Sequence, residues 1–403
     1  MKTPESLLPQ NSLFDVAIIG GGIQGAGVAQ AAAAAGYSVL LLERGDIGEG
    51  TSSKSSKLIH GGLRYLESGQ VRLVWESLKE RELLLKLAPD LVYRQHFHIP
   101  LYRSSKRKSW QLRLGLSLYY LLAGGGSDNR FRHNSSESLN NRFGELNQDD
   151  LTAIYRYSDA QTDDQALTQA VAYSAQQLGA SLLCQAQLRK AQWHDGTYLI
   201  DAQVEGVNRR FKSRCLVNTA GPWVNLVASR IQPKPPAQDV ELVQGTHLLY
   251  STPISEHCYY LEAPQDGRVV FVLPWQGQTL VGTTETLYRG HPDDCQPLEE
   301  EVAYLKAVVT HYFPDNTQEP SAQFAGLRVL PKAEGSAFSR SREVQLVTKG
   351  NYLALYGGKL TGYRATAQRV IPHLERMVGL RNRVADTSEL PLVPAESAFT
   401  STP

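Results

Sequence analysis

The sequence predicts an α/β fold in which a nucleotide-binding unit with a mainly parallel sheet is combined with an antiparallel sheet. Three observations lead to this prediction. Near the N-terminus, a short apolar strand runs directly into a glycine-rich turn and a helix, and an acidic residue closes the next strand. Between residues 240 and 285, β-rich segments follow one another, separated by turn residues. The first two features are typical of a βαβ unit that binds a dinucleotide, and the third is typical of an antiparallel sheet.

The glycine-rich turn has the spacing G-x-G-x-x-G and consists of Gly20, Gly22 and Gly25. It follows the apolar run VAII and precedes an alanine-rich segment, for which we expect a helix over residues 28–35. Gly20 allows the turn, Gly22 lets the backbone approach a pyrophosphate, and Gly25 lets the helix pack on the strand. The helix N-terminus then faces the phosphates.

Glu43 completes this pattern at the end of the second strand, SVLLLE. A carboxylate at this place accepts hydrogen bonds from both ribose hydroxyls and repels a 2′-phosphate. The pattern alone does not distinguish NAD from FAD, because both present the same ADP half to the βαβ unit.

Residues 51–66 favour a flavin. They read TSSKSSKLIHGGLRYL and combine many hydroxyls with two adjacent glycines. Small donors and close backbone approach suit a large planar ring, whereas a soluble NAD dehydrogenase would ordinarily continue into another strand and helix.

The block SSKLIHGGLRYL resembles the signature of the aerobic-type, FAD-dependent glycerol-3-phosphate dehydrogenases. The resemblance covers about residues 14 to 380 and continues through the helix predicted over 73–91. The further motifs are NTAGPWV at 218–224, QGTH at 244–247, FVLPW at 271–275, GTTE at 282–285, GLRVLP at 326–331 and YGGKLTGYR at 356–364. It implies FAD as cofactor, oxidation of sn-glycerol 3-phosphate to dihydroxyacetone phosphate by hydride transfer to FAD, and transfer of the electrons to a quinone or another acceptor.

The resemblance also implies the architecture. Such proteins have an FAD-binding Rossmann-like domain of the glutathione-reductase and D-amino-acid-oxidase type, interwoven with an antiparallel β-sheet substrate domain. We expect the first domain to comprise residues 13–90, 150–230 and 325–385, and the second residues 91–149 and 231–324. Residues 386–403 are rich in Pro, Ser and Thr and are expected to be a flexible tail, and the C-terminal helical domain of many family members is expected to be absent.

The chain departs from the family at two motif positions. Glu285 stands where the family usually has Asp, and Gly362 where it often has a second Thr. A related substrate or a different electron acceptor therefore stays open. The alternatives are a related FAD-dependent oxidase or dehydrogenase of an amino acid or a 2-hydroxy acid, and a flavin subunit of a larger electron-transfer complex.

Oxidation of an alcohol needs a base for the hydroxyl proton and positive groups that orient the substrate. His60 and His247 are the candidate bases, because an imidazole can accept a proton at neutral pH, and the sequence does not decide between them. Arginine offers planar, bidentate donors to a phosphate. The candidates that bind substrate are Arg64, Tyr65, Arg328, Arg342 and Lys359; Arg328, set between apolar residues, is also a candidate catalytic residue.

The motifs that carry the resemblance extend the expected FAD-binding set beyond Gly20, Gly22, Gly25 and Glu43. The added residues are Ser53, Lys57, Leu58, Gly61, Gly221, Trp223, Gly358, Lys359 and Thr361. For Trp223, filling the core is the alternative to forming a wall of the cofactor site. We expect no metal site, and no histidine or cysteine stands out as a covalent anchor for the flavin.

Composition narrows the class of protein and its location. The 403 residues include 41 Lys and Arg and 40 Asp and Glu, so that the formal net charge of +1 gives no basic field for nucleic acid. The four cysteines form no CxxC pair, and no signal peptide or run of 18 apolar residues occurs, which predicts a cytoplasmic protein. Residues 101–126 combine basic residues, a Trp and an apolar stretch, which favours attachment to the inner leaflet of the cytoplasmic membrane. A homo-oligomer stays open.

Overall fold

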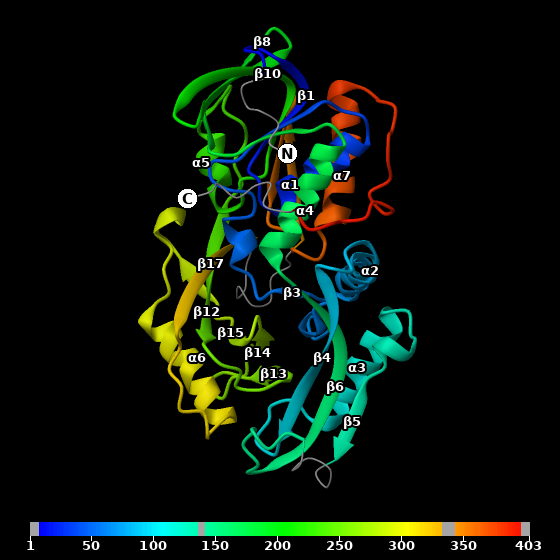
Figure 1. Cartoon of the computed structure of the whole chain (residues 1–403), viewed down its shortest axis with the longest axis vertical. Helices are drawn as coiled ribbons and strands as arrows, with labels where there is room; N and C mark the ends of the chain where they lie inside the picture. Colours follow the sequence, from blue (N-terminus) through cyan, green and yellow to red (C-terminus); the bar gives the residue numbers. More distant parts are fainter. Residues whose placement is uncertain (1–7, 136–141, 333–342, 396–403) are drawn as a thin grey trace.

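The computed structural model describes residues 8–135, 142–332 and 343–395. Its strands form two sheets, with 9 and 10 strands among these residues, which lie toward opposite ends of an elongated molecule (Figure 1). The α/β architecture and the combination of a parallel with an antiparallel sheet are confirmed.

The first sheet has a parallel centre built from five segments that lie far apart in the sequence. Their order is β7 (Ser181–Leu183), β2 (Val39–Leu42), β1 (Leu13–Ile19), β10 (Val207–Asn218) and β19 (Tyr352–Tyr356). β18 (Gln345–Lys349) adds an antiparallel edge strand. β1 and β2 are apolar along almost their whole length because both faces of the sheet are covered.

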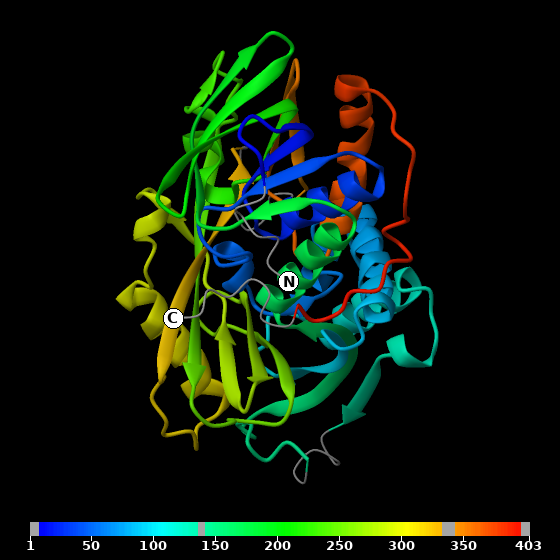
Figure 2. The same ribbon diagram turned by 45° about the horizontal axis from the view of Figure 1, so that its top comes forward.

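Helices cover one face of this sheet and antiparallel strands cover the other. Figures 1 and 2 show α1 (Ile23–Ala34), α4 (Asp164–Gln177) and α7 (Tyr363–Val378) side by side, and their apolar residues share one core with β1 and β2. The opposite face packs against β8 (Ala186–His194), β9 (Thr197–Val204), the first half of β10, the short β11 (Ile231–Gln232) and α5 (Val224–Ala228). α1 is buried along nearly its whole length, which its alanines permit because they allow close packing on all sides.

The second sheet is mainly antiparallel and contains the four β-rich segments predicted between residues 240 and 285. Its order is β16 (Thr286–Tyr288), β12 (Val240–Tyr250), β15 (Gln278–Gly282), β14 (Val269–Trp275), β13 (Cys258–Glu262), β4 (Val92–Tyr102), β6 (Leu151–Thr162) and β3 (Leu58–Ile59), with β17 (Ala322–Pro331) beside β12 and β5 (Arg132–Ser135) beside β6. The helices α2 (Val71–Leu87), α3 (Ser109–Leu122) and α6 (Glu299–Tyr312) pack on it. Short 3₁₀ turns lie at Thr51–Ser53, Leu63–Leu66, Ser127–Asn129, Gly221–Trp223 and Pro292–Asp294.

Three boundaries differ from the prediction. α1 begins at Ile23 rather than at residue 28. The helix thus includes Gly25 and Gly27, which the prediction placed in the turn before it. β6 and most of β17 belong to the second sheet, although residues from 150 and from 325 were assigned to the FAD-binding domain. The reason is long-range pairing: β6 pairs with β4, and β17 pairs with β12, along most of their lengths, which local sequence patterns do not reveal.

The flexible tail predicted from residue 386 is wrong for its first ten residues. Thr387 and Leu392 are buried, and the N–H of Leu392 donates to the carbonyl of Leu87 at 2.7 Å. Thr387 also accepts a hydrogen bond from Gln368 at 2.8 Å. Tertiary packing on α2 and α7 therefore orders a segment whose composition suggested disorder. Residues 396–403 lie outside the described residues.

Candidate functional site

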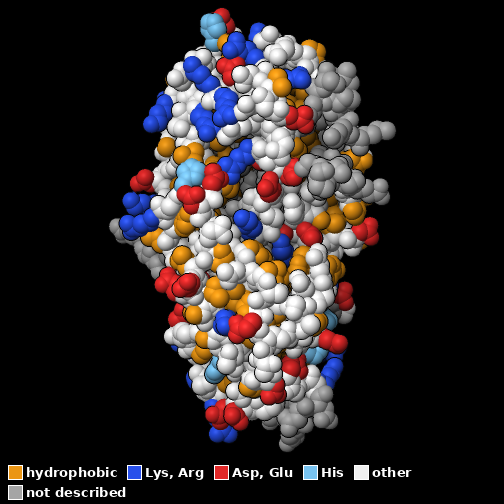
Figure 3. All heavy atoms as spheres, turned by 60° about the vertical axis from the view of Figure 1, so that its left-hand side comes forward, with side chains coloured by type: hydrophobic (Ala, Val, Ile, Leu, Met, Phe, Trp, Pro, Cys, Tyr) orange, Lys and Arg blue, Asp and Glu red, His pale blue; other side chains and the backbone are white. Residues whose placement is uncertain are grey.

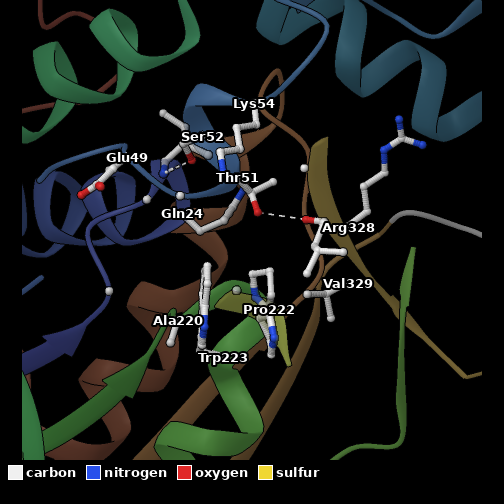
Figure 4. A pocket seen from close by; sticks show the side chains of 18 of the residues that line it. Gln24, Glu49, Thr51, Ser52, Lys54, Ala220, Pro222, Trp223, Arg328 and Val329 are labelled. Atoms are coloured by element: carbon white, nitrogen blue, oxygen red, sulfur yellow. Dashed lines mark hydrogen bonds between the residues drawn. The ribbon is translucent and has the colours of Figure 1, made fainter. Parts of the chain in front are cut away.

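A cavity of about 860 Å³ lies between the two sheets and is lined by residues from both. Its walls come from the N-terminus of α1, the segment 42–60, the segment 219–223, β17 and the loop 357–361. Figure 4 shows Thr51, Ser52 and Lys54 on one side of it, facing Ala220, Pro222 and Trp223 on the other. The volume is in the range of cofactor sites.

The glycine-rich turn is built for close approach to this cavity. Gly20 has φ +108°, and a Cβ atom added at Gly25 would lie 1.8 Å from the carbonyl oxygen of Gly20. Gly25 therefore lets α1 pack on the turn and does not line the cavity, whereas Gly20 and Gly22 do. Ser52 lies beside Gly22 and accepts a hydrogen bond from the N–H of Ile23 at 2.9 Å (Figure 4). This helix N-terminus fits a pyrophosphate.

Glu43 lies at the end of β2 and lines the same cavity. Its Oε2 accepts the N–H of Gly21 at 2.5 Å, and its Oε1 accepts the N–H of Gly45 at 2.9 Å. Burial raises the pKa of this carboxyl group, and the two backbone N–H groups oppose that shift. A carboxylate has about four acceptor sites, so that ribose hydroxyls can still bind.

Trp223 forms a wall of the cavity rather than part of the core. The guanidinium of Arg44 lies over its ring, 4.2 Å from the centroid, and both side chains donate to Asp293, Trp223 from Nε1 at 2.9 Å and Arg44 from Nη2 at 2.5 Å. All three line the cavity near Glu43. Arg44 and Asp293 could not be predicted from the sequence, because only the fold brings the two segments together.

At the other end of the cavity, the loop before α7 joins the loop that carries His60. The N–H of His60 donates to Oγ1 of Thr361 at 3.1 Å, across 301 residues of sequence. Both residues line the cavity, together with Leu58, Gly221, Gly358 and Lys359. α7 begins at Tyr363, directly after this loop, so that its positive N-terminus lies near the site.

His247 also lines the cavity, but it is held in the interior of the protein. Its Nε2 is 2.9 Å from Oγ of Ser56, and its ring stacks on Phe324 at 4.9 Å. Burial, and the positive charges of Arg328 and Lys57, lower its pKa to about 3. His247 is therefore neutral at physiological pH.

Two cationic side chains lie against Tyr65, and one of them shares Glu285 with a third, Arg328. Lys359 lies over the Tyr65 ring, 3.9 Å from the centroid, and the Arg64 guanidinium is 5.2 Å from it. Arg64 and Arg328 both donate to Oε1 of Glu285, at 3.3 and 2.9 Å. Burial opposes the charged form of Arg64, but Tyr65 and Glu285 raise its pKa above the usual value. The arrangement can bind an anionic group.

Glu301 on α6 holds the segment that carries Glu285. Its two carboxylate oxygens accept hydrogen bonds from the side chains of Thr246, Thr284, Thr286 and Gln244 at 2.6 to 2.7 Å. Burial raises the pKa of Glu301, but these hydrogen bonds outweigh that effect and lower it. Glu301 could not be predicted from the sequence, where it is one of three consecutive glutamates at the start of a helix.

Five of the predicted site residues do not line the cavity: Gly25, Ser53, Lys57, Gly61 and Arg64. Lys57 instead forms a buried ion pair with Asp164 at 2.5 Å, and Ser53 donates to the carbonyl of Glu49 at 2.6 Å. The N–H of Gly61 donates to the hydroxyl of Tyr119 at 2.9 Å. Ser53, Lys57 and Gly61 thus stabilise the loop between β2 and the first residues of the 3₁₀ turn at Leu63, rather than contact the cavity. Arg342 lies outside the described residues.

The segment predicted to face a membrane contains α3, with an apolar stripe on its outer side. Trp110, Leu114 and Leu121 are 65%, 65% and 68% exposed. The basic cluster before it is partly neutralised, since Arg107 pairs with Glu67 and Glu262. Among the described helices, none is long and apolar enough to cross a bilayer. Figure 3 brings forward the side of the molecule on which α6 and β17 lie in Figure 1, and there acidic, basic and apolar side chains are interspersed.

Comparison with known proteins identifies relatives over nearly the whole chain. Residues 15–367 match the family model described as FAD dependent oxidoreductase. The chain is 36% identical to D-erythritol 1-phosphate dehydrogenase of Brucella abortus, covering 90% of this chain and 74% of that protein. It is 34% identical to the aerobic glycerol-3-phosphate dehydrogenase of Escherichia coli, covering 89% of this chain and 73% of that protein.

Solved structures show the same fold. The glycerol-3-phosphate dehydrogenase from Bacillus halodurans, complexed with FAD, superposes with a TM-score of 0.76 at 24% identity, covering 95% of this chain and 68% of that one. The L-alpha-glycerophosphate oxidase from Mycoplasma pneumoniae, with FAD bound, gives 0.73 at 17% identity, covering 93% and 98%.

Proposed function

Because the chain belongs to the family of FAD dependent oxidoreductases, we propose that it oxidises sn-glycerol 3-phosphate to dihydroxyacetone phosphate. The observation that carries this proposal is a set of cationic side chains at one end of a cavity that fits FAD. Arg328 and Lys359 line the cavity, and Arg64 lies behind its wall and shares Glu285 with Arg328. A phosphate group is usually bound by several cationic side chains, whereas one arginine is enough to bind the carboxylate of a substrate. The names of the curated relatives point to the same class of substrate, a polyol phosphate.

We assign the following roles to the residues of the site. Gly20, Gly22 and Glu43 would hold the dinucleotide at its pyrophosphate and ribose, and Thr361 and the N-terminus of α7 would lie on the side of the ring system. A bound FAD would supply the acceptor for the hydride from the carbon that carries the hydroxyl group. Arg328 and Lys359 hold the substrate phosphate, and Arg64 supports them from behind the cavity wall through Glu285.

His60 takes the hydroxyl proton. It lines the cavity and is partly exposed, and its backbone is fixed by Thr361. His247 is the weaker candidate, because a base whose pKa is about 3 has little tendency to accept a proton at neutral pH. His247 lies within hydrogen-bonding distance of Ser56, and its ring stacks on Phe324. Both contacts are expected of a residue that supports the wall of the site.

A second candidate substrate is D-erythritol 1-phosphate. It is favoured by the 36% identity to a dehydrogenase of that name. The test is a comparison of kcat/KM for both phosphates, for an amino acid and for a 2-hydroxy acid with the FAD-loaded protein. A higher kcat/KM for glycerol 3-phosphate supports the proposal; turnover confined to the carboxylate substrates overturns it.

For the electron acceptor we propose a quinone, reached by attachment of α3 to one leaflet of a membrane. Trp110, Leu114 and Leu121 form the apolar stripe that would enter the lipid interface. Exchanging Trp110 and Leu114 for Ser should reduce cosedimentation with anionic lipid vesicles severalfold. Trp193→Ser is the control, since this exposed tryptophan lies on β8 in the other sheet. Equal loss in both variants, or no loss in either, would contradict the attachment.

A further inference from the structure

A second cavity, of about 210 Å³, lies in the second sheet at β4, β6 and β13, away from the large cavity. Figure 1 shows β4, β5 and β6 together at the lower end of the molecule. The residues that line it are Gln95, His96, His98, Asn134, Arg142, Phe143, Arg156, Glu256, His257 and Cys258, and none of them lines the large cavity.

Cationic and imidazole side chains form a row across three adjacent strands at this cavity. His98 on β4 lies directly opposite Arg156 on β6, which lies directly opposite Arg132 on β5. Directly paired residues in a sheet point to the same face. Arg142 and His257 approach from the neighbouring loops. With His98 and Arg156 they make four nitrogen-rich side chains that line the cavity, and Arg132 lies next to Arg156 in the row.

This positive charge has no acidic partner within the described part of the chain. Arg132, Arg142 and Arg156 form no ion pair there, and Glu256, the acid among the lining residues, forms none either. Burial, and then the charges of Arg132 and Arg142, lower the pKa of Arg156. Like charges placed opposite each other destabilise a sheet, so that an anion between them would relieve the repulsion.

The floor of the cavity is preorganised. His98 is buried, and its Nδ1 lies 3.3 Å from the carbonyl oxygen of Cys258, to which it donates. Its ring packs against Phe143 at 5.1 Å and against His257 at 4.9 Å. Nε2 of His257 is 3.3 Å from the carbonyl oxygen of Arg142, which ties the loop that carries Arg142 to β13.

We propose that this second cavity binds a small soluble molecule with a phosphate group, held by Arg142 and Arg156 and by the side-chain amide of Asn134. Guanidinium groups bind phosphate oxygens with charge-assisted hydrogen bonds. The volume of about 210 Å³ is about a quarter of that of the large cavity, about 860 Å³. It therefore suits a phosphate ester with a few carbon atoms better than a dinucleotide.

The orientation of the cavity favours a soluble ligand over a lipid headgroup. Phe97, Tyr155 and Tyr157 point to the face of the sheet on which α3 packs. His98 and Arg156 alternate with them and point to the opposite face. The cavity is therefore turned away from the exposed stripe of α3.

The test is a titration of the FAD-loaded protein with inorganic phosphate by isothermal calorimetry, in a buffer free of other phosphates. The wild type should bind phosphate at two sites, one in each cavity. Arg156→Gln should weaken one site about tenfold or more, while Arg328→Gln should leave that site intact. Arg189→Gln, on β8 in the other sheet, is the control and should keep both sites.

Arg156→Gln should also leave the kcat for the proposed substrate unchanged, which separates this site from the proposed function. Folding is checked by flavin content and melting temperature, and Arg142→Gln provides a second variant should Arg156→Gln fail to fold. Phosphate binding that neither variant alters overturns the proposal. So does a loss that affects only binding to phosphatidylglycerol vesicles and not binding of free phosphate.

Discussion

Arg328 on β17 donates from Nη1 to Oε1 of Glu285, in the segment after β15, at 2.9 Å. Arg64 donates to the same oxygen at 3.3 Å. One buried carboxylate thus fixes two guanidinium groups before any substrate arrives. Such preorganisation lowers the entropic cost of binding an anion. Glu285, rather than a shorter Asp, sets the place of both groups.

Arg328→Gln should raise KM for glycerol 3-phosphate about 10- to 100-fold, because it removes charge-assisted hydrogen bonds to the phosphate. Steady-state kinetics of the FAD-loaded variant measure this. The exposed Arg189→Gln should behave like the wild type. An unchanged KM for Arg328→Gln would exclude this arginine as a phosphate ligand.

Glu301→Ala should destabilise the fold by about 1–3 kcal/mol and also raise KM. The threonine hydroxyls that bind Glu301 would lose their acceptor in the interior, and the segment with Glu285 would lose its support. Urea unfolding and kinetics check both effects. Glu300→Ala, on the exposed side of the same helix, is the matched control and should change neither. Lower stability with unchanged KM would show that Glu301 does not position Glu285.

His60→Gln should lower kcat about 10²- to 10⁴-fold, the usual contribution of a general base. It should also remove the acidic limb from the pH profile of kcat, because the titrating group is gone. His247→Gln should keep that limb, since a pKa of about 3 lies below the pH range over which kcat is measured. If the limb disappears in His247→Gln and persists in His60→Gln, the two roles are reversed.

Stability should fall in mild acid because two buried histidines resist protonation. The pKa values of His98 and His247 are lowered to about 3, mainly by burial. Between about pH 3 and pH 6.5 the unfolded chain therefore binds more protons, so that their contribution is complete above about pH 6.5 and is lost as the pH falls.

Each of the two histidines should lower the free energy of unfolding by up to about 2 kcal/mol between pH 7 and about pH 5. Urea unfolding in phosphate-free buffer measures the loss. His247→Asn should remove about half of the loss due to this pair, and the exposed His194→Asn should remove none. Equal pH dependence in the wild type and His247→Asn would contradict the lowered pKa.

Lys57→Met should destabilise the protein by about 3–5 kcal/mol, because it leaves Asp164 buried without its partner. The folded fraction should nevertheless keep a full complement of FAD, since Lys57 does not line the cavity. Flavin content per folded protein is the measurement. Loss of FAD without loss of stability would restore Lys57 to the cofactor-binding residues.

The parts of the fold that could be predicted are those with a local signal. The turn of Gly20, Gly22 and Gly25 fixes its own geometry, and Glu43 follows it at the end of the next strand. Apolar and β-branched runs likewise placed β1, β2 and the four strands between residues 240 and 285. Membership of β6 and β17 in the second sheet could not be predicted, because it depends on pairing between distant strands.

The same distinction applies to the candidate site. His60, Tyr65, Arg328 and Lys359 lie in recognisable motifs and do line the cavity. Lys57 lies in such a motif too, yet its side chain turns into the interior toward Asp164, which no spacing indicates. Arg44 and Asp293 meet only across the two sheets, so that no local pattern could have found them.

Oxidation of glycerol 3-phosphate by the flavin can be observed in an anaerobic visible spectrum of the FAD-loaded protein, recorded before and after addition of this substrate. We expect the absorption band of the oxidised flavin to bleach, and a quinone to restore it faster than air does. A yellow protein whose spectrum does not respond to glycerol 3-phosphate, but bleaches with an amino acid or a 2-hydroxy acid, would contradict this proposal.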